Sequence, residues 1–231
     1  MLDVVLPVYN EEKSLKAVLL ALYDEIHPKV SMRFIISEDG STDRTLAILY
    51  DLCTILPMEL LTHDSRMGYS SAMKRVFRKV QAPYVLCVDS DGQYDPKDFW
   101  KLWSARDKSD IVTGYRKHRV DSKLRLFLSR ACYLCFRPFF PKNIHDPSCS
   151  FVLFRKEVAQ ALVPTLGLTN EGFWWEFMIR AKQHGLRVSE QAVHHRARFA
   201  GNTKIYTYLY IPGIVLRHIV AMFRTILSRP S

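Results

Sequence analysis

Apolar and polar positions follow one another along the first half of the chain in a pattern that predicts strands alternating with helices. Short apolar runs rich in β-branched residues predict buried strands. Between them, apolar residues recur at helical spacing. The predicted strands cover 2–8, 33–37, 58–62, 84–88 and 111–114, and the predicted helices cover 11–26, 43–53, 69–80 and 99–105. This alternation favours an α/β fold with a mostly parallel, doubly wound sheet and helices on both faces.

Polar side chains follow three of the predicted strands at their carboxyl ends. Residues 10–11 follow the first strand, 38–39 the second and 89–91 the fourth. In open α/β sheets, ligands bind in the crevice outside the carboxyl ends of the strands. We therefore expect these three segments to converge on one crevice.

Asp89 and Asp91 stand one residue apart, directly after an apolar strand. Two neighbouring carboxylates repel each other unless a cation lies between them, and hard oxygen ligands favour Mg²⁺ or Mn²⁺. Mg²⁺ in proteins also commonly binds substrate phosphates. The pair therefore predicts a site where a metal meets a phosphorylated substrate. For the pair taken alone, a solvated turn after a strand is the alternative.

The second half of the chain is less regular. Residues 121–142 mix bulky apolar and basic side chains, whereas 172–184 predicts a helix with Glu176 inside an aromatic run. A buried carboxylate is costly unless it is paired or used, and Arg180 one turn on is the structural alternative as a partner. The segment 213–228 is amphipathic, which is typical of a helix packed on the core or of one lying at a membrane interface.

The composition is that of a globular protein with an excess of basic residues. Of the 231 residues, 48% are hydrophobic, and the formal net charge is +10. This excess indicates an anionic partner: nucleic acid, an anionic membrane surface or phosphorylated small molecules. No nucleic acid is expected, because the basic residues are scattered among apolar ones and no recognition motif is present. No stretch is long and apolar enough to predict a membrane-spanning helix.

The five cysteines are an odd number spread along the chain, and no secretory pattern precedes them. This usage predicts free thiols in a reducing, cytoplasmic compartment. Cys132 and Cys135 have no second Cys or His pair at zinc spacing. They are better interpreted as two small side chains three residues apart on a helix.

Four motifs and a downstream segment occur in order along the chain. They are residues 4–12 (VVLPVYNEE), 38–43 (EDGSTD), 89–93 (DSDGQ) and 146–158 (DPSCSFVLFRKEV), followed by 198–204 (RFAGNTK). Together they resemble the family-2 inverting glycosyltransferases, and among these the polyprenyl-phosphate sugar transferases such as dolichyl-phosphate mannose synthase. The resemblance extends over nearly the whole chain.

The resemblance implies a GT-A fold, with a catalytic domain at 1–204 and amphipathic helices at 205–231 that lie on a membrane surface or pack on the domain. It implies that Asp89, Asp91 and Gln93 hold Mg²⁺ or Mn²⁺. The residues implied to bind the donor are Pro7, Tyr9, Glu11, Ser37, Asp39 and Ser90, with Arg198 and Lys204 closing over its pyrophosphate.

The resemblance also implies an acceptor site. Arg116 and Arg130 would meet phosphate groups, because guanidinium pairs with phosphate bidentately. A lipid phosphate is already anionic near neutral pH and needs no general base. A hydroxyl acceptor would need one, and Glu176 is a candidate for that role, although a positioning role fits its family counterpart better.

Several positions depart from the family pattern, which leaves the sugar and the acceptor open. Glu38 replaces the first Asp of the turn, and Val152 replaces a common basic residue. The expected partners are a GDP-mannose or UDP-hexose donor, polyprenyl phosphate and the cytoplasmic face of a membrane, reached directly or through an anchoring partner subunit. The alternatives are transfer to a hydroxyl of a surface glycan and a non-catalytic regulatory subunit that binds nucleotide sugars.

Overall fold

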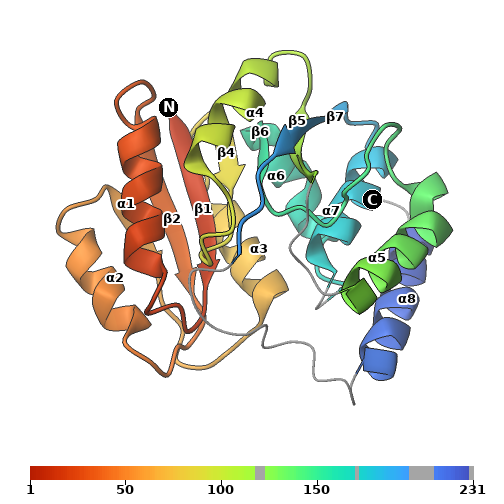
Figure 1. Cartoon of the computed structure of the whole chain (residues 1–231), viewed down its shortest axis with the longest axis horizontal. Helices are drawn as coiled ribbons and strands as arrows, with labels where there is room; N and C mark the ends of the chain where they lie inside the picture. Colours follow the sequence, from red (N-terminus) through yellow and green to blue (C-terminus); the bar gives the residue numbers. More distant parts are fainter. Residues whose placement is uncertain (118–122, 170–171, 198–210, 229–231) are drawn as a thin grey trace.

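The computed structural model describes residues 1–117, 123–169, 172–197 and 211–228, with the side chains of 123–125 and 211–215 outside the description. In this part of the chain, the strands form one sheet with the order β3-β2-β1-β4-β6-β5-β7 (Figure 1). They are β1 (Leu2–Val8), β2 (Met32–Glu38), β3 (Met58–Leu61), β4 (Tyr84–Cys87), β5 (Ile111–Arg116), β6 (Val152–Arg155) and β7 (Val188–Val193). Only β6 runs antiparallel to its neighbours among these strands. The predicted fold class, a mostly parallel α/β sheet, is confirmed.

Helices cover both faces of the sheet, because successive side chains of a strand point to opposite faces. In β1, Val4 and Leu6 belong to one core cluster, whereas Val5 belongs to the other. The first cluster is covered by α1 (Leu15–Ile26), α2 (Thr45–Cys53) and α4 (Phe99–Ala105). The second is covered by α3 (Tyr69–Lys79), α6 (Lys156–Leu162) and α7 (Phe173–Gln183). Short 3-10 helices cover Pro96–Asp98, Arg137–Phe139 and Val163–Thr165.

Two further helices, α5 (Lys123–Phe136) and α8 (Ile211–Leu227), lie side by side at one end of the sheet (Figure 1). Phe136 of α5 contacts Phe223 of α8, with ring centroids 5.5 Å apart. Met222 is fully buried in the second core cluster, whereas Leu216 and Leu227 are 63% and 78% exposed. The helix predicted at 213–228 therefore packs on the core with one side and leaves apolar side chains exposed on another.

Candidate functional site

The polar segments that follow β1, β2 and β4 contact one another at the carboxyl edge of the sheet. The backbone N–H of Asn10 donates to Oγ of Ser41 at 2.9 Å. The hydroxyl of Ser90, a buried residue, donates to the carbonyl oxygen of Pro7 at 3.3 Å. The convergence expected from the strand pattern is therefore present, and it includes two of the predicted donor-binding residues, Pro7 and Ser90.

Asp39 holds the loop that leads into α3. Its carboxylate accepts hydrogen bonds from the backbone N–H groups of Met67 and Gly68, at 2.7 Å and 2.8 Å. Gly40 lets this loop approach, because its φ is +70° and a Cβ there would lie 2.6 Å from the carbonyl carbon of Ser65. Asp39, which the resemblance assigns to the nucleoside, thus also holds the loop at this edge of the sheet.

The same loop places Arg66 over Tyr9, with the guanidinium carbon 4.3 Å from the ring centroid. Such a contact is a cation–π interaction. Sequence reasoning misses Arg66, and its place in the loop after β3 is the only signal for it. Glu11 accepts a hydrogen bond from the Ser14 hydroxyl at 2.8 Å. Ser37 is fully buried, and its Oγ has no hydrogen-bond partner among the described residues.

The two aspartates after β4 are held in different ways. Asp89 is half-buried and accepts hydrogen bonds from the hydroxyls of Tyr69 at 3.0 Å and Ser150 at 2.5 Å. Asp91 is 6% exposed and accepts a hydrogen bond from the backbone N–H of Gln93 at 3.1 Å. The structure therefore brings both carboxylates to the converging edge.

The carboxylate pair fits a divalent ion that is bound together with substrate. In the part of the chain that the structure describes, no group of three or more His, Cys, Asp or Glu side chains could hold a metal. Asp89 and Asp91 supply oxygen ligands that suit Mg²⁺ or Mn²⁺, and such ions complete their shells with substrate phosphates and water. The side-chain nitrogen of Gln93 donates to the carbonyl oxygen of Arg196 at 3.1 Å, so a metal would bind its amide oxygen.

A groove of about 330 Å³ opens between β5 and α5. Basic side chains line it, and apolar side chains lie among them. The lining residues are Tyr115, Arg116, Lys117, Leu126, Ser129, Arg130, Tyr133, His145, Asp146, Pro147, Ser148 and Trp175. The two arginines that the resemblance assigns to phosphate, Arg116 and Arg130, therefore line the same groove.

Arg116 is paired with Asp146 inside the wall of this groove. Its Nε and Nη2 donate to the two oxygens of the Asp146 carboxylate at 2.7 Å and 2.8 Å, and Nη2 also donates to Ser148 Oγ at 2.6 Å. Burial acts to lower the pKa of Arg116, but the interactions with Tyr94 and with the paired Asp146 together outweigh it and hold that pKa above its ordinary value. Lys117 and Arg130, in contrast, are exposed.

Glu190 of β7 supports the segment that carries Asp146. Its Oε1 accepts hydrogen bonds from the backbone N–H groups of His145 and Asp146, both at 3.0 Å. Its Oε2 lies 2.8 Å from Nδ1 of His145. Sequence reasoning misses Glu190, because nothing in a polar strand distinguishes this carboxylate from a solvated one.

Glu176 is fully buried in α7 and holds the loop that precedes the helix. Its oxygens accept hydrogen bonds from the backbone N–H groups of Gly167, Leu168 and Thr169 at 3.0–3.1 Å, and from the Thr169 hydroxyl at 2.9 Å. Arg180, the alternative partner that helical spacing offers, donates hydrogen bonds to Gln183 and Ser228. Glu176 thus has a set of partners that positions a loop. Arg198 and Lys204 lie outside the described residues.

Comparisons with known proteins give this site its context. The family model described as glycosyl transferase family 2 matches residues 3–163. The chain belongs to this family. A dolichyl-phosphate beta-glucosyltransferase from Dictyostelium discoideum is 31% identical over 84% of this chain and 65% of its own length. A dolichol-phosphate mannosyltransferase from Pyrococcus furiosus is 28% identical over 69% of this chain and 47% of its own length.

Solved structures show the same fold. A glucosyl-3-phosphoglycerate synthase from Mycobacterium tuberculosis in complex with phosphoglyceric acid matches with a TM-score of 0.75 at 18% identity, over 98% of this chain and 80% of that one. The same enzyme with Mn²⁺, uridine diphosphate and glucosyl-3-phosphoglycerate matches with a TM-score of 0.74 at 18% identity, over 100% of this chain and 81% of that one. The GT-A-like fold implied by the motifs is therefore confirmed. The chain spans about half to two thirds of the length of the two curated relatives above.

Proposed function

We propose that this protein is a metal-dependent, inverting glycosyltransferase that moves a hexose from a nucleoside-diphosphate sugar to polyprenyl phosphate. The observation that carries the proposal is one continuous segment, 146–150, which joins the two halves of the site. Asp146 and Ser148 line the basic groove, whereas Ser150 bonds to the Asp89 carboxylate. A phosphate acceptor in the groove and a donor at the carboxylates would therefore be neighbours.

On the donor side, Asp89, Asp91 and the amide oxygen of Gln93 would hold Mg²⁺ or Mn²⁺. When bound, such an ion stabilises the negative charge that develops on the departing nucleoside diphosphate. Tyr9, with Arg66 over its ring, would meet the nucleotide base at the edge of the same site. From outside the described residues, Arg198 and Lys204 would add positive charge over the pyrophosphate.

On the acceptor side, the groove combines the cations and the apolar surface that a lipid phosphate needs. The phosphate is already a nucleophile, so it requires cations that hold it and no base. Lys117 and Arg130 are exposed cations in the groove, and Arg116 is a fixed one behind them. Leu126 and Trp175 supply apolar surface for the adjoining isoprenoid. An acceptor oxygen would form its bond to the anomeric carbon on the face opposite to the leaving diphosphate.

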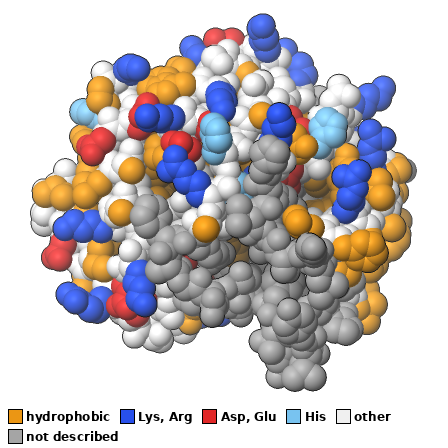
Figure 2. Space-filling model, viewed as in Figure 1, with side chains coloured by type: hydrophobic (Ala, Val, Ile, Leu, Met, Phe, Trp, Pro, Cys, Tyr) orange, Lys and Arg blue, Asp and Glu red, His pale blue; other side chains and the backbone are white. Residues whose placement is uncertain are grey.

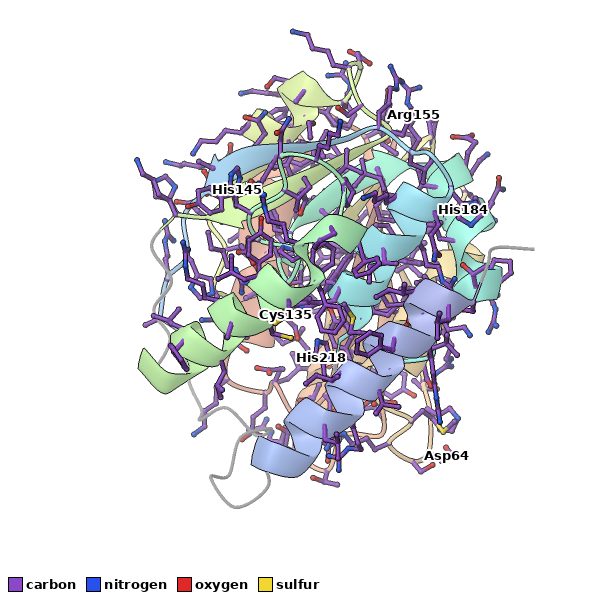
Figure 3. The ribbon with its side chains drawn as sticks, turned by 90° about the vertical axis from the view of Figure 1, so that its right-hand side faces the viewer. Asp64, Cys135, His145, Arg155, His184 and His218 are labelled. Atoms are coloured by element: carbon purple, nitrogen blue, oxygen red, sulfur yellow. The ribbon has the colours of Figure 1, made fainter. Side chains whose placement is uncertain are left out.

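The surface beside the groove supports a membrane-bound acceptor. Phe127, Leu134, Leu216 and Phe223 of α5 and α8 are all more than half exposed. Figure 2 shows hydrophobic side chains, with Lys and Arg nearby, on the side of the molecule that carries these helices. Figure 3 looks onto this side, with α5 and α8 next to each other. None of the helices described is long and apolar enough to cross a bilayer. We propose that this face rests on the cytoplasmic leaflet.

A binding and transfer panel tests the proposed function. Thermal shifts with Mn²⁺ and GDP, GDP-mannose, UDP or UDP-glucose identify the donor, and Asp91→Ala is the paired variant. We expect one nucleotide family to stabilise the wild type with Mn²⁺, and no stabilisation of the variant. Transfer to polyprenyl phosphate is then compared with transfer to a glycan hydroxyl. Transfer to the hydroxyl alone would overturn the acceptor assignment, and donor binding without any transfer would favour a regulatory subunit.

A further inference from the structure

The Asp89 carboxylate is held from two opposite segments by side-chain hydroxyls. Tyr69, the first residue of α3, donates to Oδ1 at 3.0 Å. Ser150, two residues before β6, donates to Oδ2 at 2.5 Å. Among the residues that the structure describes, each carboxylate oxygen thus receives one neutral donor, which leaves it a second lone pair. Neither hydroxyl belongs to the motifs assigned to metal or donor above.

The direction of the Tyr69 hydrogen bond is fixed by its surroundings. The indole nitrogen of Trp174 in α7 lies 2.8 Å from the Tyr69 oxygen, and an indole N–H can only donate. The Tyr69 oxygen therefore accepts from Trp174, so its own hydrogen is directed to Asp89.

The direction of the Ser150 hydrogen bond is fixed in the same way. Tyr94 and Ser150 place their hydroxyl oxygens 3.1 Å apart. An ionised carboxylate can only accept, so Ser150 gives its hydrogen to Asp89 and leaves its oxygen free to accept from Tyr94, which also lies 3.6 Å from Cys149 Sγ. The Tyr94 oxygen in turn accepts the backbone N–H of Ser150 at 3.3 Å. Hydrogen bonds of fixed direction from two side-chain hydroxyls therefore end on one carboxylate.

We propose that Tyr69 and Ser150 are positioning residues that fix the plane of the Asp89 carboxylate for a divalent ion bound with the donor diphosphate. This inference rests on the proposed function. The terminal torsion of an aspartate is broad, so rotamer preference alone does not set the carboxylate plane. Two hydrogen bonds, one from a hydroxyl to each carboxylate oxygen, set this plane. The remaining lone pairs are then presented in one fixed orientation.

The test is Mn²⁺ binding in the presence of saturating UDP or GDP, whichever stabilises the wild type, measured by calorimetry. Partners that orient a metal ligand typically change metal affinity by about 10–100-fold. We expect Tyr69→Phe and Ser150→Ala each to weaken Mn²⁺ binding within that range. Tyr84→Phe is the matched control, because it removes a tyrosine hydroxyl bond to Asp107 at the opposite end of β4. It should leave Mn²⁺ affinity unchanged.

The outcomes separate this inference from the function on which it rests. Wild-type Mn²⁺ affinity in folded Tyr69→Phe and Ser150→Ala would overturn the positioning role and leave the metal-dependent function intact. Equal weakening in Tyr84→Phe would also overturn it, because the effect would then be general loss of stability. A wild type that binds no Mn²⁺ with either nucleotide would contradict the proposed function itself. Near-ultraviolet circular dichroism establishes that each variant is folded.

Discussion

Replacing Asp146 should strongly destabilise the protein, because it leaves a buried guanidinium without its partner. Arg116 and Asp146 are 8% and 5% exposed, and two hydrogen bonds of 2.7 Å and 2.8 Å join them. Removing one partner of a buried ion pair costs about 3–5 kcal/mol, since the other charge remains desolvated. Asp146→Asn keeps the volume and removes the charge. We expect its free energy of unfolding to fall by about 3 kcal/mol or more.

Urea unfolding followed by tryptophan fluorescence measures this difference. The matched control is Asp110→Asn, which breaks an ion pair of similar length to Arg187, whose side chain is 64% exposed. Surface pairs contribute about 0–1 kcal/mol, so the control should stay close to wild type. If Asp146→Asn lowers the free energy of unfolding no more than Asp110→Asn does, burial does not set the strength of the Arg116–Asp146 pair. Replacing both partners, as Arg116→Met with Asp146→Leu, should recover much of the loss.

Three further predictions concern other parts of the structure. Gly40→Ala should destabilise more than Gly185→Ala: both have positive φ, but only at Gly40 would a Cβ meet backbone, at 2.6 Å. In urea unfolding, the free energies of unfolding of these two variants should differ by more than about 1 kcal/mol. Glu176→Gln should lower the free energy of unfolding by at least about 2 kcal/mol, because the amide nitrogen would face backbone N–H donors. Burial raises the pKa of the Cys149 thiol to about 12, so iodoacetamide at pH 8 should alkylate exposed Cys135 first, as read by peptide mass spectrometry.

For each of these three predictions, one result would contradict it. Equal costs for Gly40→Ala and Gly185→Ala would mean that the loop after β3 relaxes freely. A stable Glu176→Gln with abolished transfer would point to a chemical role for this carboxylate in place of the loop-holding role. Alkylation of Cys149 at the rate of Cys135 in the folded protein would show that the sheet around Cys149 opens readily.

The part of the fold that positions the candidate site could be predicted from the sequence. Buried parallel strands are apolar along their length, so β1, β2 and β4 stand out, and the polar residues after them mark the edge where ligands bind. β7 could not be found in this way, because Val193 is its only buried residue. β6 is four residues long and runs antiparallel to both of its neighbours, and a local sequence pattern does not reveal strand direction.

The chemistry of single side chains was less predictable, because it depends on partners far away in the sequence. Glu176 illustrates this: helical spacing points to Arg180, but the carboxylate instead satisfies the backbone N–H groups of residues 167–169. The same holds for Arg116, whose partner Asp146 lies thirty residues on. Long-range pairs of this kind are set by how strands and loops pack, so neither motif nor periodicity specifies them.

The most direct test of the proposed function is transfer of radiolabelled sugar into lipid. The purified protein would be incubated with Mn²⁺, polyprenyl phosphate in anionic vesicles and the labelled donor that stabilises it, and the organic phase would then be counted. We expect label in the organic phase that requires Mn²⁺ and polyprenyl phosphate and is abolished by Asp91→Ala. Label that enters lipid equally with Asp91→Ala, or no label in the lipid from a donor that binds, would contradict it.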